Sequence, residues 1–168
     1  MKRLAVYAGS FDPLTLGHLD IARRVSALFE ELHLVVAVNP KKAALFSTDE
    51  KLAMLEASVK DLRPQCKIVI RAHEGLIVNY CKSIGGQVLI RGLRALSDFE
   101  SEFQMATMNR HLNGAIETLH IMTDEKYFFL SSSLVKELAQ WDVDLNELVP
   151  APVAVALKAK MGKKGEEK

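Results

Sequence analysis

Residues 7–18 read Tyr-Ala-Gly-Ser-Phe-Asp-Pro-Leu-Thr-Leu-Gly-His and decide the fold. The apolar run 4–8 leads into them and predicts a buried strand, and apolar residues at helical spacing predict a helix over about 17–30. Glycine and proline punctuate the segment between, which predicts a tight loop. A strand that enters a helix through such a loop directs free backbone N–H groups and the positive end of the helix dipole at one point. That point suits a phosphate, and His18 in the first helical turn can reach it.

Composition predicts a soluble globular protein. The 168 residues are 49% hydrophobic and 26% charged, which is enough for one domain with a substantial core. The 22 Lys and Arg oppose 21 Asp and Glu, so the net charge is only +1. Proteins that bind nucleic acid or membrane surfaces through charge carry a basic excess, so neither partner is expected. Any phosphate site must therefore use cations that are placed locally.

The cysteines and the start of the chain predict a cytoplasmic protein. Cys66 and Cys81 form no disulfide framework and are expected to be small apolar fillers. The chain begins Met-Lys-Arg and enters its first strand without a signal cleavage site. No apolar run approaches the length needed to span a membrane.

Short apolar runs alternate with helical segments along the chain. Strands are expected at 4–8, 32–38, 67–71, 88–90 and 118–122. Helices are expected at 17–30, 47–62, 76–84, 97–112, 134–141, 143–148 and after Pro150, two of them opened by the capping boxes Ser47-x-x-Glu50 and Ser97-x-x-Glu100. This alternation predicts an α/β fold, a Rossmann-like doubly wound five-stranded parallel sheet with helices on both faces. We expect one domain over 1–160 and a charged, disordered tail over 161–168.

In such sheets ligands bind beyond the C-terminal ends of the strands, so the loops at those ends should meet on one rim. The expected loops are 9–18, 39–46, 72–76, 91–97 and 123–133. Three of them carry phosphate-binding groups: Lys41-Lys42, Arg91-Gly-Leu-Arg94 and Ser131-Ser132-Ser133. Lysine and paired guanidinium groups bind phosphate directly, and serine hydroxyls at a helix start can also do so. The rim therefore predicts a polyphosphate site.

Residues 15–18 match the Thr-x-Gly-His signature of the nucleotidyltransferase superfamily. The longer Gly-Ser-Phe-Asp-Pro start resembles the phosphopantetheine adenylyltransferase family, and two later blocks, 88–102 and 127–136, resemble it as well. Ser10 stands where that family commonly has threonine, which keeps the hydroxyl. The resemblance implies transfer of AMP from ATP to 4′-phosphopantetheine, giving dephospho-coenzyme A and pyrophosphate, the penultimate step of coenzyme A synthesis.

The resemblance also implies roles for single residues. Catalytic roles fall on His18, Lys42 and Arg91. Phosphopantetheine is expected on Ser10, Lys42, Ile77 and Arg91. ATP is expected on Ser10, Phe11, His18, Gly92, Leu93, Arg94, Glu102, Tyr127, Phe128, Phe129, Leu130, Ser131, Ser132 and Ser133. Because the attacking phosphate is already ionised, no general base is needed, and His18 is expected to donate a hydrogen bond to the transition state.

Ordinary structural roles stay open for several of these residues. Phe11 can be a core aromatic, and Glu102 can be a solvated helix carboxylate. The serines can serve only as a helix cap. Ile77 can belong to a buried helix face, and the aromatic run before Ser131 can fill the core instead of packing against adenine. Lys41 is expected to be a solvated surface charge.

The implied reaction brings further expectations about cofactors and partners. Mg²⁺ should accompany ATP and be held mainly by phosphates and water, without an assigned protein ligand. The family resemblance implies a homohexamer, a dimer of trimers, and dephospho-coenzyme A or coenzyme A as product or inhibitor. Two alternatives remain: another nucleotidyltransferase, such as one acting on nicotinate mononucleotide, or a sensor of nucleotide or coenzyme A without catalysis.

Overall fold

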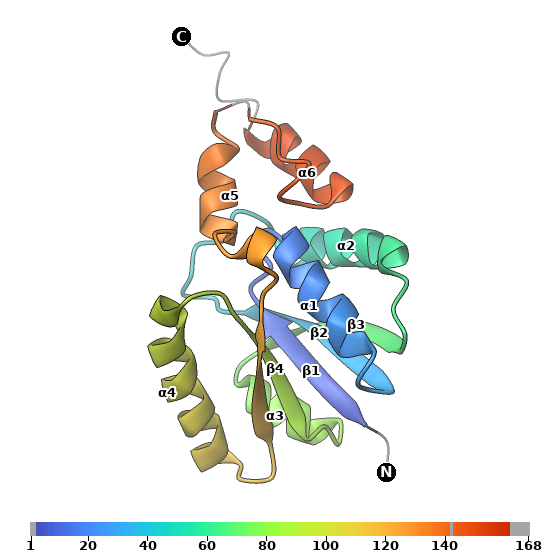
Figure 1. Cartoon of the computed structure of the whole chain (residues 1–168), viewed down its shortest axis with the longest axis vertical. Helices are drawn as coiled ribbons and strands as arrows, with labels where there is room; N and C mark the ends of the chain where they lie inside the picture. The colour runs from blue at the N-terminus through green and yellow to red at the C-terminus, as the bar shows by residue number, and fades with distance from the viewer. Residues whose placement is uncertain (1–2, 142, 162–168) are drawn as a thin grey trace.

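The computed structural model describes residues 3–141 and 143–161, and in these ranges five parallel strands form one sheet (Figure 1). The strands pair in the order β3-β2-β1-β4-β5. Their bounds are β1 Leu4–Gly9, β2 Glu31–Val38, β3 Lys67–Glu74, β4 Val88–Leu93 and β5 Glu117–Met122. The chain order reverses at β1, so the C-terminal end of β1 lies at the topological switch point where ligands of such sheets bind.

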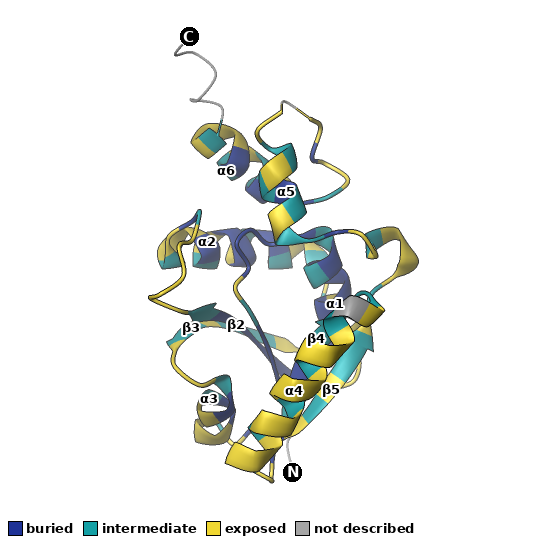
Figure 2. Ribbon diagram, turned by 90° about the vertical axis from the view of Figure 1, so that its left-hand side faces the viewer, coloured by how far each residue is buried: buried dark blue, intermediate teal, exposed yellow. Residues whose placement is uncertain are grey.

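Helices cover both faces of the sheet, which confirms the predicted doubly wound α/β fold (Figures 1 and 2). Side chains of β1 alternate between two buried clusters: Ala5 and Tyr7 join one, Val6 and Ala8 the other. The first cluster includes side chains of α1 (Leu16–Ser26), α2 (Thr48–Val59), α5 (Ser132–Leu138) and α6 (Ala151–Met161). The second includes α3 (Ile77–Ser83), and α4 (Leu96–Leu112) packs beside β4 and β5. Two short 3₁₀ helices complete the fold, η1 Lys60–Leu62 and η2 Glu125–Tyr127.

The fourth strand is longer than its apolar run predicts. Residues 91–97 were expected to form the exit loop, but Arg91, Gly92 and Leu93 continue the ladder opposite His120 to Met122 of β5. The pairing partner, not the residue type, sets where the strand ends. Gly92 suits this position because a Cβ there would lie 2.6 Å from the side chain of Ile21 on α1. Arg91 therefore projects from a rigid strand.

One of the two predicted capping boxes is confirmed. At the start of α2 the backbone N–H of Ser47 donates to the Glu50 carboxylate at 2.6 Å, and Glu50 N–H donates to Ser47 Oγ at 3.2 Å. The box at Ser97 is wrong, because α4 begins at Leu96 with Ala95 as an N-cap that makes no side-chain hydrogen bond. The Asp98 carboxylate instead accepts from the backbone N–H of Arg94 at 3.3 Å.

The predicted helix over 143–148 is also wrong, and only a turn forms there. The Leu145 carbonyl accepts from the N–H groups of Leu148 and Val149, and the Leu148 carbonyl accepts from Leu16 N–H at 2.9 Å. This segment thus anchors the start of α1. The tail predicted over 161–168 lies, apart from Met161, outside the described residues.

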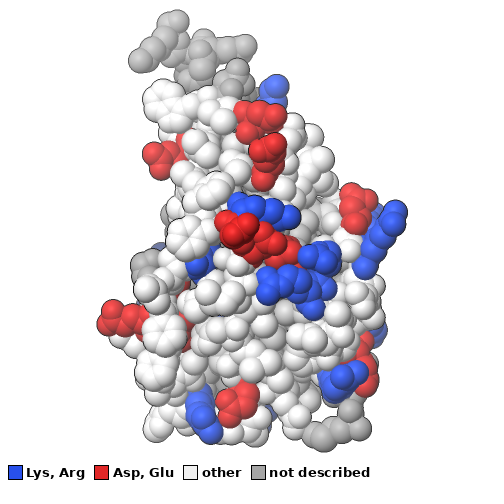
Figure 3. Space-filling view, in the orientation of Figure 1, with Lys and Arg blue, Asp and Glu red and all other residues white. Residues whose placement is uncertain are grey.

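Positive and negative side chains are interspersed over the face drawn in Figure 3, without a broad surface of one sign. This pattern agrees with the net charge of +1. Over the described ranges, no helix combines the length and the apolar character that crossing a membrane requires.

Candidate active site

The loop between β1 and α1 fixes the ring of His18. Thr15 caps α1, and its backbone N–H donates to Nδ1 of His18 at 3.0 Å. The Thr15 hydroxyl lies 2.8 Å from the same nitrogen. Because a backbone N–H can only donate, Nδ1 must accept, and the single proton of the neutral ring resides on Nε2. The loop therefore presents His18 as a hydrogen-bond donor through Nε2.

His18 stays neutral at physiological pH. Burial lowers its pKa to about 4, and the positive charges of Arg94 and Arg91 act in the same direction. Its ring packs edge-on against Phe11, with the ring centroids 5.2 Å apart. Phe11 itself is 1% exposed, so its side chain is part of the core, which is the structural role that its sequence also allowed. A neutral, fixed imidazole can stabilise developing negative charge without acting as a base.

His18 lines a cavity of about 400 Å³ at the C-terminal ends of β1 and β4, which we call the polar cavity. Its wall combines the β1–α1 loop, the arginines of β4 and its exit, and the serines before α5. The residues that line it are Tyr7, Ala8, Gly9, Ser10, Gly17, His18, Ile21, Arg91, Gly92, Arg94, Asp98, Ser101, Glu102, Thr123, Leu130, Ser131, Ser132 and Ser133. Distant blocks of the sequence thus converge on one site.

Arg91 is held by a carboxylate from α4. Its Nε and Nη2 donate to the two oxygens of Glu102 at 2.8 and 2.6 Å, and Nη1 donates to the Ala8 carbonyl at 3.0 Å. This hydrogen bonding to Glu102 raises the pKa of Arg91. Glu102 is therefore not a solvated helix carboxylate. His120 Nε2 lies 3.9 Å from the same carboxylate and, within the described residues, has no hydrogen-bond partner.

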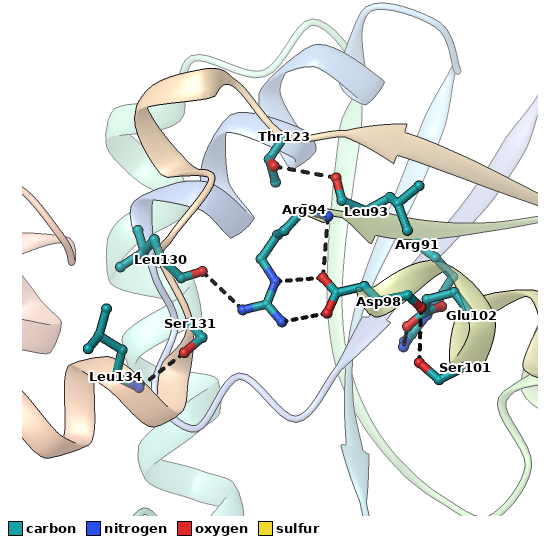
Figure 4. A network of polar contacts seen from close by, with 10 residues as sticks. All are labelled: Arg91, Leu93, Arg94, Asp98, Ser101, Glu102, Thr123, Leu130, Ser131 and Leu134. Atoms are coloured by element: carbon teal, nitrogen blue, oxygen red, sulfur yellow. Dashed lines mark hydrogen bonds and ion pairs between the residues drawn. The ribbon is translucent and has the colours of Figure 1, made fainter. Parts of the chain in front are cut away.

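Arg94 is held in a similar way by Asp98, which lies one helical turn before Glu102 on α4 (Figure 4). Its Nε and Nη2 donate to the two oxygens of Asp98 at 2.9 and 3.1 Å, and Nη1 donates to the Leu130 carbonyl at 3.3 Å. The last contact ties the guanidinium group to the segment that enters α5. Ser131 caps that helix by accepting from Leu134 N–H at 3.1 Å. Ser132 Oγ donates to the Pro13 carbonyl at 2.8 Å, which joins the serine segment to the β1–α1 loop.

A second cavity, of about 540 Å³, adjoins the first on the α3 and α4 side of the sheet, and we call it the apolar cavity. Ala8 and Arg91 line both cavities. Ile77, which the family resemblance assigned to phosphopantetheine, lines this one. The other lining residues are Val6, Ala37, Val38, Asn39, Pro40, Glu74, Gly75, Leu76, Leu89, Ile90, Met105 and Asn109. The cavity is suited to an elongated, mainly apolar chain with a few amide contacts.

A third cavity, of about 230 Å³, holds three lysines and is called the lysine cavity here. It shares Ser10, Ser132 and Ser133 with the polar cavity and Ala37 and Asn39 with the apolar one. Lys42, Lys51 and Lys136 line it together with Asp12, Ala43 and Ala44. Each of the three cavities therefore shares wall residues with the other two.

Most residues expected at the site line these cavities, and five do not. Lys42 lines the lysine cavity instead of the polar cavity that holds His18. The five that line none of the three cavities are Phe11, Leu93, Tyr127, Phe128 and Phe129. Phe128 and Phe129 are 57% and 61% exposed, so they do not fill the core. Contact of these five with a nucleotide stays a prediction.

Sequence reasoning missed Lys51 and Asp98. Lys51 stands at helical spacing with Met54, Leu55 and Ser58, the buried stripe of α2, and a charge in an apolar stripe was the signal that could have found it. Asp98 was visible four residues after Arg94, at the spacing of a helical ion pair. Both residues add charge to the site that the named motifs do not include.

Comparison with known proteins identifies the family. The cytidylyltransferase-like family matches residues 6–138. The phosphopantetheine adenylyltransferase of Staphylococcus carnosus (strain TM300) is 47% identical over 159 residues, covering 95% of this chain and 97% of that protein. That of Staphylococcus haemolyticus (strain JCSC1435) is 46% identical over 162 residues, covering 96% and 99%.

Solved structures share the fold at low identity. Nicotinic acid mononucleotide adenylyltransferase of Plasmodium falciparum, complexed with NaAD, matches with a TM-score of 0.69 and 16% identity over 95% of this chain and 96% of that one. A putative nicotinate-nucleotide adenylyltransferase from Vibrio parahaemolyticus matches at 0.66 and 13%, over 95% and 93%. By its match to the family and its identity to these relatives over nearly its whole length, the chain belongs to the phosphopantetheine adenylyltransferases of the cytidylyltransferase-like family.

Proposed function

We propose that the protein transfers the adenylyl group of ATP to 4′-phosphopantetheine, forming dephospho-coenzyme A and pyrophosphate. The observation that carries this proposal is that three unlike cavities adjoin one another pairwise through shared wall residues at the C-terminal ends of the central strands. The polar cavity suits the triphosphate, the apolar cavity suits the pantetheine arm, and the lysine cavity suits the phosphate of the acceptor. The two relatives at 46–47% identity carry the name of this activity.

The proposed step is a direct displacement at the α-phosphorus. An oxygen of the acceptor phosphate forms a bond to that phosphorus, the bond from it to the bridging oxygen breaks, and pyrophosphate leaves with the electron pair. A phosphomonoester is largely ionised at pH 7, so no proton has to be removed first. The chain's part is to position both reactants and to donate hydrogen bonds where charge develops. His18 Nε2–H, held from behind by Thr15, is the fixed donor.

Mg²⁺ is proposed to enter with ATP. Bound to phosphate oxygens, it would offset their negative charge during the displacement. Two carboxylates line the polar cavity, those of Asp98 and Glu102, and each accepts hydrogen bonds from an arginine. Across the described ranges, His, Cys, Asp and Glu side chains form no group of three able to hold a metal. The ion is therefore proposed to be held through phosphates and water.

Self-assembly is proposed from the surface of α4. Large apolar side chains of α4 and the edge strand β5 are about half or more exposed: Leu96, Phe99, Phe103, Met105, Met108, Leu112, Leu119 and Met122. A patch of this kind on a globular protein marks an interface. We propose that further copies of the chain cover it, in the hexamer of two trimers that the family resemblance implies. Light scattering after size-exclusion chromatography measures the mass directly.

The cellular setting follows from the same proposal. Cys66 and Cys81 are free thiols, as expected for a reducing compartment, so we place the enzyme in the cytoplasm. Dephospho-coenzyme A and coenzyme A resemble the product and are proposed to occupy the same cavities as product or inhibitor.

The deciding experiment measures pyrophosphate release from ATP with a panel of acceptors. The panel contains 4′-phosphopantetheine, pantetheine and nicotinate mononucleotide. We expect release only with 4′-phosphopantetheine. Release with nicotinate mononucleotide alone would establish the first alternative, and tight binding of ATP and coenzyme A without any turnover would establish the sensor. The solved nicotinate-nucleotide enzymes are only 13–16% identical and support the shared fold alone.

A further inference from the structure

Lys51 is a buried cation on the floor of the lysine cavity. It lies in the first turn of α2 and is 6% exposed, although lysine is almost never this buried without a partner. Removing an ammonium group from water is unfavourable unless an opposite charge or hydrogen-bond acceptors compensate. The position of Lys51 therefore needs an explanation beyond packing.

No carboxylate supplies that compensation. Among residues 3–141 and 143–161, none lies within ion-pair distance of Lys51 Nζ. The one carboxylate in the cavity wall, Asp12, accepts from the backbone N–H groups of Leu45 and Phe46 at 3.0 and 2.9 Å. It also pairs with Lys136 Nζ at 3.2 Å. Burial alone would raise the pKa of Asp12, but these three donors together lower it. Asp12 is thus already balanced.

The wall of the cavity accordingly carries an excess of positive charge. Lys42, Lys51 and Lys136 face it from three different elements, against the single carboxylate of Asp12. Ser10, Ser132 and Ser133 add hydroxyl groups that can donate hydrogen bonds. A phosphomonoester carries a charge of about −1.5 to −2 at pH 7 and three acceptor oxygens. Its chemistry therefore matches both the charge and the donors of this cavity.

We infer that Lys51 is a binding residue of a phosphomonoester subsite and contacts the phosphate of the acceptor. The inference rests on the proposed function and adds a residue that no motif singled out. Two sources of phosphate are available, the acceptor and the triphosphate of ATP. The lysine cavity shares the wall residues Ala37 and Asn39 with the apolar cavity, so an elongated ligand lying in the apolar cavity can place a terminal phosphate beside Lys51. The triphosphate already has Arg94 and His18 in the polar cavity.

Burial gives Lys51 a role different from that of Lys42. Lys42 is exposed and lies in the turn after β2, where its N–H donates to the Asn39 carbonyl at 3.0 Å. Its side chain must be ordered when the ligand binds, which opposes binding. Lys51 leaves a helix, and its side chain is already confined. We therefore expect Lys51 to supply a preorganised charge and Lys42 to close over the phosphate from the solvent side.

The test is calorimetric titration of the whole protein with 4′-phosphopantetheine, pantetheine and a non-hydrolysable ATP analogue. Lys51→Met should weaken binding of 4′-phosphopantetheine by about tenfold or more, as expected for loss of a charge-assisted hydrogen bond. Binding of pantetheine and of the ATP analogue should stay within about twofold. Lys51→Arg should restore most of the loss. The matched control is Lys41→Met, an exposed lysine of the neighbouring turn, which should bind all three as the wild type does.

Equal binding of 4′-phosphopantetheine by Lys51→Met and wild type would overturn the inference. So would a loss of affinity in Lys51→Met that is equal for 4′-phosphopantetheine and for pantetheine. A loss confined to the ATP analogue would assign the subsite to the nucleotide and overturn it too. If Lys51→Met does not fold, the Lys51 side-chain NMR signal of the wild type, assigned through Lys51→Arg, must shift with 4′-phosphopantetheine and not with pantetheine. Wild type that neither binds nor adenylylates 4′-phosphopantetheine would instead refute the proposed function, and the subsite with it.

Discussion

Replacing His18 tests the mechanism most directly. In the wild type, Thr15 occupies Nδ1 through its backbone N–H at 3.0 Å and its hydroxyl at 2.8 Å, so Nε2–H is the only donor that can face the cavity. His18→Ala removes that one donor. Loss of a single preorganised donor to a transition state lowers kcat by about 10²–10³, or roughly 2.7–4 kcal/mol. KM for ATP should change by a smaller factor, because the contact strengthens only as charge develops.

The assay is steady-state release of pyrophosphate with both substrates varied. His18→Gln is the matched variant, since its amide N–H₂ can reach toward the place of Nε2 and should recover part of kcat. His18→Ala loses the reciprocal half of the capping box, the bond from Thr15 N–H to Nδ1, whereas the Thr15 hydroxyl can still accept from the backbone N–H of residue 18; the loss is worth up to about 1 kcal/mol of stability. Urea unfolding therefore accompanies the kinetics, so that a fall in kcat is not confused with loss of folded protein.

The pH profile supplies an independent check on the same residue. The pKa of His18 is lowered to about 4, so the ring is neutral from pH 8 down to about pH 5. His18 should then contribute no acid limb to kcat near pH 6.5, and its protonation should matter only near pH 4. Two results would refute the reasoning: a kcat for His18→Ala within a few-fold of wild type, or an acid limb near pH 6.5 that disappears in His18→Gln.

Three further predictions concern binding, stability and assembly. Arg91→Ala should raise KM for 4′-phosphopantetheine more than KM for ATP, because Arg91 borders the apolar cavity as well as the polar one; the opposite ranking in initial-rate kinetics would exchange the roles of Arg91 and Arg94. The pKa of Asp12 is lowered in the folded state, so its charge stabilises the protein above its ordinary pKa near 4, and this stability is lost as pH falls through the lowered value. The difference in urea unfolding free energy between wild type and Asp12→Asn should therefore shrink from pH 7 to pH 3. A difference that stays constant over this range would contradict the stabilising role of the Asp12 charge. Phe103→Asp on the exposed surface of α4 should yield a smaller particle by light scattering, and an unchanged mass would place the interface elsewhere.

The fold could be predicted because the pattern of the strands is strong. The central strands β1 and β2 are buried on both faces, so the sequence of each is a nearly continuous apolar run between polar segments. The collection of the loops at one rim also follows from the sequence, because parallel strands all end at the same edge of a sheet. What could not be predicted was where individual strands and helices end. Arg91 lies in a strand only because β5 pairs with it, and 143–148 form a turn because the Leu148 carbonyl is used by Leu16.

The site was predictable to the extent that its residues stand in local motifs. His18, Arg94 and the serines before α5 occupy loops whose function can be inferred from neighbouring residues. Partners brought in by tertiary packing could not be inferred in that way. Glu102 reaches Arg91 across eleven residues and from another element, and its bidentate contact depends on how α4 packs beside β4. Lys51 belongs to no motif, and its burial depends on how α2 packs against β2 and β3.

The cations of the site differ in whether a carboxylate already holds them. Arg91 and Arg94 are each hydrogen-bonded to both oxygens of a carboxylate on α4, so a phosphate group that binds either arginine must displace or share that carboxylate. Within the part of the chain that the structure describes, Lys51 has no such competitor, and we expect an acceptor phosphate to meet its charge directly. Binding at the arginines therefore requires that an ion pair be broken or shared, whereas binding at Lys51 does not. We therefore expect the two substrates to be bound by different electrostatic arrangements, with Ser10 in the wall that the polar and lysine cavities share.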